Sequence, residues 1–200
     1  SPSSDALVLR PGIGRVEMDN NLLILLAIVA IVIVGGLMIY NRRRSDHLRE
    51  RFGSEYERQV EEVGSRSKAE AELAEREKRV SKLTIVPLSP ADQDRFLDRW
   101  TKVQATFVDD PERSIDYADA LLAEVMTARG YPVSDFDQRA GDISVDHPNV
   151  VQHYRAGHEI AVSHSQGKAS TDELRQALIH YRALFEELVT ERAPQPEHSH

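Results

Sequence analysis

The chain has 200 residues, enough for one compact domain and a short additional segment. It contains no cysteine, which excludes disulfide bonds, thiolate metal sites and cysteine nucleophiles. The formal net charge is −8 and the excess of acids lies in residues 45–200, so we expect no nucleic-acid partner, because nonspecific nucleic-acid binding depends on neutralising phosphates.

The first 21 residues lack any periodic pattern and predict a disordered N-terminal segment. The chain begins with a serine, whereas Met18 stands immediately before an apolar run. We therefore interpret Met18 as the natural start and residues 1–17 as upstream sequence.

Residues 22–40 are the most distinctive stretch, with nineteen residues and no charge. As a helix they would extend roughly 28 Å, close to the ~30 Å hydrocarbon thickness of a bilayer. A buried core helix of this length would show polar periodicity, and a signal peptide would have a basic start and a shorter apolar region. The run therefore predicts a retained single transmembrane helix.

The arginines that flank this run predict its orientation. Residues 41–60 contain six arginines and residues 1–21 contain two. The positive-inside rule then places the C-terminal side in the cytoplasm and the N-terminus outside. The membrane-anchor flank, Arg42, Arg43 and Arg44, would lie among lipid headgroups, so the first predicted partner is the lipid bilayer.

Residues 41–83 predict a basic juxtamembrane segment and a helical stalk. Apolar residues at helical spacing occur on both sides of an interruption at Gly64: Leu48, Phe52, Tyr56, Val60 and Val63, then Ala69, Leu73, Val80 and Leu83. Arg76 stands where an apolar residue is expected. A straight stalk of roughly 57 Å and a hairpin bent at Gly64 both remain open, and the repeat is too short to establish a coiled coil. A homo-oligomer formed through anchor and stalk is a further possibility.

Residues 84–192 predict an all-α soluble domain, a small bundle of about four helices. Ser89 and Pro90 read as the N-cap and first residue of the first helix. A second helix follows Pro111 and ends at Gly130. The expected core stripes are Phe96, Trp100, Val103 and Phe107, then Ile115, Ala118, Leu122, Val125 and Met126.

The rest of this domain predicts an irregular connection and two more helices. Residues 134–148 read as the connection, with at most a short turn at 136–140. Pro148 is expected to start the third helix, and the spacing of Ser170 and Glu173 predicts a capping box for the last. Residues 193–200 are polar and predict a disordered tail.

Carboxylate and imidazole groups between residues 142 and 164 are the only suggestion of chemistry. The weak metal candidates are Asp142, Asp146, His147 and His158. Ligands on one helix face lie three or four residues apart, whereas His153, His158 and His164 are five and six apart. We therefore predict no metal, no cofactor and no catalytic residue, and interpret His147 as helix-cap chemistry and His158 as a hydrogen-bonded core residue.

Four-residue segments at 153–156 and 180–183 both read His-Tyr-Arg-Ala. We interpret this echo as the coincidental composition of two amphipathic helices.

Several short motifs together resemble one family. They are Phe107-Val108-Asp109-Asp110-Pro111, Arg129-Gly130-Tyr131-Pro132, Ser144-Val145-Asp146-His147-Pro148, Leu174-Arg175-Gln176-Ala177 and His180-Tyr181-Arg182. In residues 20–190 the chain resembles an uncharacterised bacterial family of single-pass membrane-anchored helical proteins, often labelled hypothetical or secreted. The resemblance implies a bacterial inner membrane and no catalytic residue. The label "secreted" conflicts with the arginine asymmetry, which we follow.

The sequence therefore predicts a membrane-tethered helical module that binds an unknown protein partner. The candidate interaction surface, drawn from the loops, comprises Arg129, Tyr131, Asp146 and His147. The alternative is an enzymatic, metal-binding or ligand-binding helical domain that uses the Asp/His cluster, and this alternative requires those groups to converge in one pocket.

Overall fold

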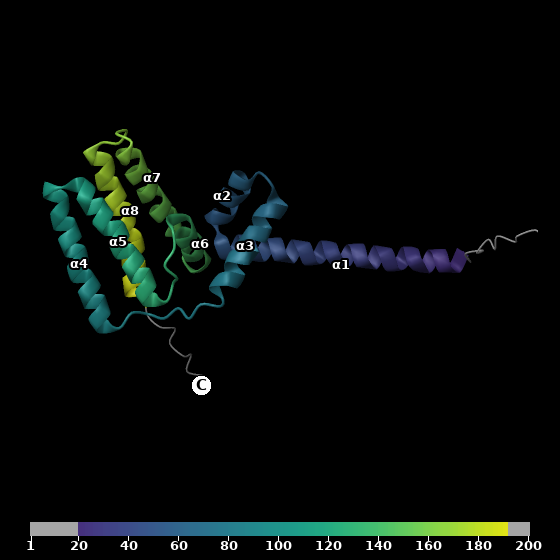
Figure 1. The fold of residues 1–200 in the computed structure, drawn as a ribbon. Helices are drawn as coiled ribbons and strands as arrows, with labels where there is room; N and C mark the ends of the chain where they lie inside the picture. The colour runs from purple at the N-terminus through teal and green to yellow at the C-terminus, as the bar shows by residue number, and fades with distance from the viewer. Residues whose placement is uncertain (1–19, 192–200) are drawn as a thin grey trace, which may run out of the picture. The chain divides into compact units, whose positions relative to one another are not determined.

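The computed structural model describes residues 20–191, which form eight α-helices and no strand (Figure 1). The expected all-α class is confirmed. The predictions about Met18, residues 1–17 and the tail 193–200 lie outside the described residues. The chain divides into two compact units, residues 1–44 and residues 45–200, which are described separately.

Helix α1, Asn20–Phe52, supplies all the described structure of the first unit. Its most apolar 18-residue window has no buried residue, and among residues 20–191 it is the one helix long and apolar enough to cross a membrane. This helix is therefore a candidate membrane span. It continues without a break through Arg42, Arg43 and Arg44.

The second unit begins with a helical hairpin formed by α2, Ser54–Val63, and α3, Arg66–Val80. Gly64 ends α2 at φ 67°, a left-handed conformation that glycine adopts without a steric penalty. Of the two alternatives for the stalk, the structure has the bent one. A small core joins the end of α1 to this hairpin and to α6, and it contains Leu48, Phe52, Tyr56, Leu73, Val80 and Val145.

The sequence predicts a stalk that ends at residue 83 and a separate domain that begins at residue 84. The structure does not divide the chain at this position. Residues 45–83 belong to the same compact unit as the helices that follow. The physical reason is that their apolar face is shared, since Val145 of α6 lies in the same core as Leu73 of α3.

Helices α4, Pro90–Asp109, and α5, Pro111–Arg129, begin and end as their sequences predict. Ser89 and Asp110 are the N-caps, each followed by proline. Gly130 adopts φ 104°, and a Cβ there would lie 2.2 Å from the Thr84 carbonyl oxygen. Glycine is therefore required both by the backbone conformation and by the linker that passes beside it.

The connection expected at residues 134–148 is instead largely helical. Helix α6, Phe136–Asp146, is capped by Asp135, whose side chain accepts a hydrogen bond from the Gln138 backbone N–H. Its residues 140–145 are all buried, so they give no one-sided stripe in the sequence. The expectation of an irregular segment is wrong because tertiary burial, rather than an amphipathic pattern, supports this helix.

Helices α7, Val151–Ser165, and α8, Thr171–Thr190, complete the unit. Helix α7 begins three residues after Pro148, and the capping box at Ser170 and Glu173 is confirmed. In Figure 1, α8 lies between α5 and α7. The main core runs along these helices, with Trp100 of α4 stacked on Phe185 of α8 at 4.6 Å between ring centroids. Every predicted core residue of α4 and α5 is buried except Phe107, which is half-buried.

Candidate functional site

A buried carboxylate that the sequence analysis did not single out joins the hairpin to α7. Glu55 of α2 is fully buried and accepts five hydrogen bonds. Their donors are Arg58 at 2.8 and 2.9 Å, Arg76 at 3.1 Å, Arg155 at 2.7 Å and Gln152 at 3.0 Å. Both oxygens are satisfied, so this cluster ties α2, α3 and α7 together through one charge.

These donors decide the protonation state of Glu55. Burial alone would raise the pKa of the carboxyl, but the hydrogen bond from Arg58 and the charge of Arg155 outweigh it and lower the pKa to about 2. The carboxylate is therefore ionised at every physiological pH. This cluster explains why Arg76 stands where the helical pattern of α3 predicts an apolar residue. The Arg76 guanidinium donates hydrogen bonds to Glu55 and, at 2.6 Å, to Gln59.

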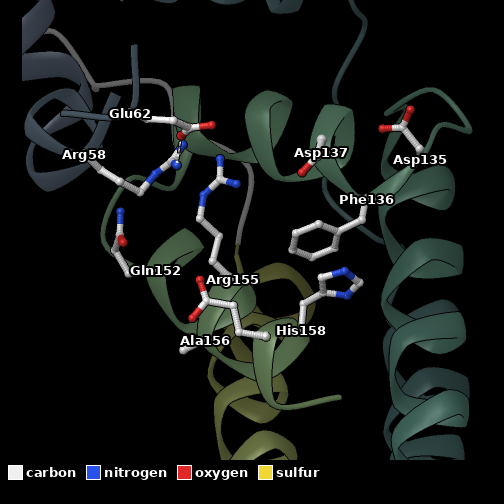
Figure 2. Close-up of a pocket in the computed structure, with 10 residues that line it drawn as sticks. Arg58, Glu62, Asp135, Phe136, Asp137, Gln152, Arg155, Ala156 and His158 are labelled. Atoms are coloured by element: carbon white, nitrogen blue, oxygen red, sulfur yellow. Dashed lines mark hydrogen bonds and ion pairs between the residues drawn. The ribbon is translucent and has the colours of Figure 1, made fainter. Parts of the chain in front are cut away.

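A polar cleft of about 740 Å³ opens beside this cluster (Figure 2). Its walls come from α2, α6 and α7, and its charged lining residues are Arg58, Glu62, Asp135, Asp137, Arg155 and Glu159. Both arginines are paired with Glu55. The cleft therefore presents mainly carboxylates, with no nucleophile held beside a base.

His158 lies on one wall of this first cleft rather than in the core. Its ring stacks on Phe136 at 3.5 Å between centroids and 9° between planes, as Figure 2 shows. Burial lowers the pKa of His158 more than Asp119 and Asp137 raise it, so the imidazole is neutral at pH 7. The expectation of a hydrogen-bonded core histidine is wrong, because the ring is half-buried and packs by stacking.

The four residues of the candidate interaction surface come together in a second cleft. This cleft has a volume of about 320 Å³, and its lining comprises Arg51, Ile85, Pro87, Arg129, Tyr131, Asp146, His147 and Glu191. Asp146 accepts hydrogen bonds from Arg51 at 3.1 Å and Tyr131 at 3.2 Å. Burial and the charge of Asp146 raise the pKa of Tyr131, which therefore remains a neutral donor.

His147 and Arg129 form the other half of the second cleft. His147 is the C-cap of α6, through its backbone N–H, and not a cap of the helix expected to start at Pro148, because α7 begins later, at Val151. Its Nδ1 lies 3.3 Å from Glu187 and its Nε2 lies 3.3 Å from Glu191. Arg129 pairs with Glu191 and donates to the Leu188 carbonyl at 3.2 Å. Most of this surface is thus buried and internally paired.

The weak metal candidates do not converge. Asp142 is buried against Arg79 of α3, with contacts of 2.6 and 2.9 Å. Asp146 and His147 line the second cleft, and His158 lines the first. Among residues 20–191 no group of three His, Asp or Glu side chains is placed to hold a metal ion. The geometric condition set for the enzymatic alternative is therefore not met in the described part of the chain.

The sequence echo brings two histidines together. Helices α7 and α8 lie side by side, and His153 Nδ1 lies 3.0 Å from His180 Nδ1. Burial and the charge of His153 lower the pKa of His180. Because one nitrogen must donate and the other accept, the contact requires at least one neutral ring. The repeated four-residue segment therefore has a structural counterpart, although two ligands alone make no closed metal site.

The fold and clefts define an all-helical protein with one candidate membrane span and a compact helical unit. Comparison of the chain with family models, curated proteins and solved structures returned no match. The resemblance to a membrane-anchored bacterial family accordingly remains a prediction.

Proposed function

We propose that this protein is a single-pass membrane-tethered helical module that holds residues 45–191 at the cytoplasmic face and binds another protein there. One observation carries the proposal: the unbroken helix α1 contains an unburied apolar window at one end and the buried residues Leu48 and Phe52 at the other. A helix with both features contributes to a candidate membrane span and to the core of a folded unit.

The proposed topology rests on the flanking arginines. The proposed location, a bacterial inner membrane, rests on the family resemblance. The absence of native cysteine allows a direct test. Single cysteines at the exposed residues Asn20 and Lys168 would be treated with a membrane-impermeant maleimide in intact cells. Labelling of Asn20→Cys in intact cells and of Lys168→Cys only after permeabilisation is expected. The reverse pattern would refute the topology.

Binding of a protein, rather than catalysis, is supported by how the polar groups are used. In the second cleft Asp146 is bound by Arg51 and Tyr131, and beside the first cleft Glu55 is fully hydrogen-bonded by its neighbours. A catalytic site would require a nucleophile, base or acid poised toward a cavity. The second cleft is the proposed contact region, because it contains the four loop-derived residues and is open to solvent through the half-exposed Arg51.

Affinity capture from detergent extracts tests the interaction. The full chain and a variant lacking residues 87–191 should give different partner lists. Arg51→Ala, at the rim of the second cleft, should weaken capture, whereas Arg175→Ala is the matched control, since its exposed guanidinium also pairs with one aspartate. Identical lists from all four proteins would refute partner binding by this unit.

A further inference from the structure

A buried guanidinium in the second cleft depends on a carboxylate from the end of the described chain. The side chain of Arg129 is only 3% exposed. Two of its nitrogens face backbone carbonyls, those of Val86 at 3.4 Å and Leu188 at 3.2 Å, and neither carbonyl carries a charge. The neutralising group is Glu191. A buried cation without an anion is strongly unfavourable, so some carboxylate must occupy this position.

The group that now fills this position is weakly held. Glu191 lies one residue beyond the end of α8, and its side chain is 41% exposed. The backbone N–H of Glu191 donates to the Glu187 carbonyl at 3.1 Å. Glu191 forms an ion pair with Arg129 and lies 3.3 Å from His147 Nε2, and among residues 20–191 its buried Oε2 has no well-formed hydrogen bond. A competing carboxylate would therefore displace only this terminal side chain.

His147 provides a second, independent sign of a ligand position. Its side chain is 97% buried, with 3% exposed, and it lines the second cleft. Within the described residues its Nε2 makes no hydrogen bond, although it lies 3.3 Å from the Glu191 carboxylate. A buried imidazole nitrogen without a partner is unfavourable unless a ligand atom approaches it. A freely placed carboxylate would align with both Arg129 and His147 better than the tethered Glu191 does.

The charges around the second cleft favour one anion at this position. Asp146 is already neutralised by Arg51 at 3.1 Å and receives a hydrogen bond from Tyr131 at 3.2 Å. On the opposite side, the carboxylates within residues 20–191 that contact Arg129 and His147 are those of Glu191 and the half-exposed Glu187. The present occupant is a carboxylate, which matches the planar fork of a guanidinium.

We infer that the second cleft is a carboxylate-binding site formed by Arg129 and His147, that Glu191 occupies it in the free protein, and that a carboxylate of the partner protein replaces Glu191. The partner assignment rests on the proposed function, whereas the carboxylate site itself does not. An acidic side chain and a free chain terminus present the same chemical group.

Chemical rescue of an emptied site is the test. Glu191→Ala in the full-length protein in detergent micelles should lower the Tm by several degrees relative to wild type. Sodium acetate, compared with sodium chloride at equal ionic strength, should restore the Tm saturably in this variant and leave wild type unchanged. Glu186→Ala is the matched control, because Glu186 is an exposed residue of α8 whose ion-pair partner in the described part of the chain is the exposed Arg182. An acetate response no greater than that of the control would overturn the site.

A second measurement separates binding at the site from general stabilisation. In Glu191→Ala, acetate should shift the NMR signals of the His147 imidazole with the same midpoint as the Tm. Inorganic phosphate is the competing anion, and an equal effect at equal concentration would overturn the carboxylate assignment. N-acetylalanine carries the carboxylate of a chain terminus, and N-acetylglutamate α-amide carries that of an acidic side chain. The compound that binds more tightly shows which of these two carboxylates the second cleft prefers.

The partner assignment has its own outcome. If a partner carboxylate competes with Glu191, then Glu191→Ala should capture more partner than wild type, and added acetate should reduce that gain. Reduced capture by Glu191→Ala would make Glu191 a contact residue and overturn competition. Because acetate binding needs no partner, loss of rescue and loss of capture are distinguishable failures.

Discussion

At the scale of single residues, Glu55 is the side chain whose environment is most demanding. It brings one negative charge into contact with three arginines from three helices. A buried ion pair adds little net stability when complete, but removing one member leaves charges unpaired in a dry environment. Arg76 and Arg155, both largely buried, would be left in that state.

Neutralising Glu55 should therefore destabilise the protein strongly. Glu55→Gln is expected to lower the free energy of unfolding by about 3 kcal/mol or more, because the arginines lose their common anion. Urea denaturation followed by circular dichroism measures this loss. Glu57→Gln is the control, since Glu57 is exposed and its contact with Arg49 is 3.9 Å long, and a change below about 1 kcal/mol is expected. Equal effects of the two substitutions would contradict the role of Glu55.

Protonation of Glu55 should also contribute to the loss of stability at low pH. Its pKa is about 2 in the folded protein, below the ordinary value of 4.5, so the unfolded chain binds the proton more readily. Its contribution, about 3 kcal/mol for a shift of this size, is fully present above pH 4.5 and is lost as pH falls toward 2. Denaturation at a series of pH values should show a flatter acid limb for Glu55→Gln than for wild type. Parallel curves would rule out a lowered pKa.

At the scale of helices, some elements were predictable because their signals are local. The caps at Ser89 and Ser170 and the Gly130 stop are readable within a few residues, and all three are confirmed. Helix α6 was missed because it contains weak helix formers and is buried along a continuous stretch. The bend at Gly64 was left open because composition alone does not decide whether α2 folds back on α3.

The residues of the clefts were also predictable only where the sequence signal is local. Arg129, Tyr131, Asp146 and His147 were chosen from loop segments, and the structure brings them together. Their partners Arg51 and Glu191 were not predicted, because these lie far away in the sequence. The contact between Glu55 and Arg155 joins residues one hundred positions apart. The only sequence signal for that cluster was the misplaced charge of Arg76.

Two glycines, one at the end of α5 and one inside α6, should respond oppositely to substitution. Gly130→Ala is expected to cost about 2 kcal/mol or more, because φ is 104° and a Cβ would lie 2.2 Å from the Thr84 carbonyl oxygen. Gly141→Ala in α6 should be neutral or stabilising by up to about 1 kcal/mol, because the nearest atom, Arg76 Nε, is 3.5 Å away and alanine favours helix. Thermal unfolding compares them. The reverse order would contradict the close approach of the linker to α5.

The pairing of α7 with α8 should weaken on mild acidification. Burial and the charge of His153 lower the pKa of His180, so its contribution is complete above about pH 6.5 and declines as pH falls below that value. Protonation of His180 then places a positive charge 3.0 Å from the His153 ring and opposes the contact. His180→Gln should lose less stability than wild type between pH 7 and pH 5. The partly buried His164, whose pKa is raised by its hydrogen bond with Glu112, is the control, and His164→Gln should not reduce the loss.

At the scale of the whole molecule, the compact unit begins inside α1 rather than after the hairpin. Its first residue, Ser45, bonds Glu70 at 2.7 Å, and Leu48 and Phe52 are buried beside α3. Helix α3 in turn contacts α6 through the ion pair of Arg79 with Asp142. Removing the hairpin would therefore expose an apolar core and leave Asp142 buried without its partner.

Truncation of the chain measures where the folded unit starts. A fragment of residues 45–191 should be soluble and unfold in one cooperative transition, because it retains the Glu55 cluster and both apolar cores. A fragment of residues 84–191 lacks Glu55 and Arg79, so Arg155 and Asp142 become unpaired, and Val145 loses the apolar side chains around it. This shorter fragment should aggregate or unfold at a markedly lower temperature. Equal thermal stability of the two fragments would instead make the hairpin an independent stalk, and the polar contacts that join it to α6 and α7 would then contribute little to the fold.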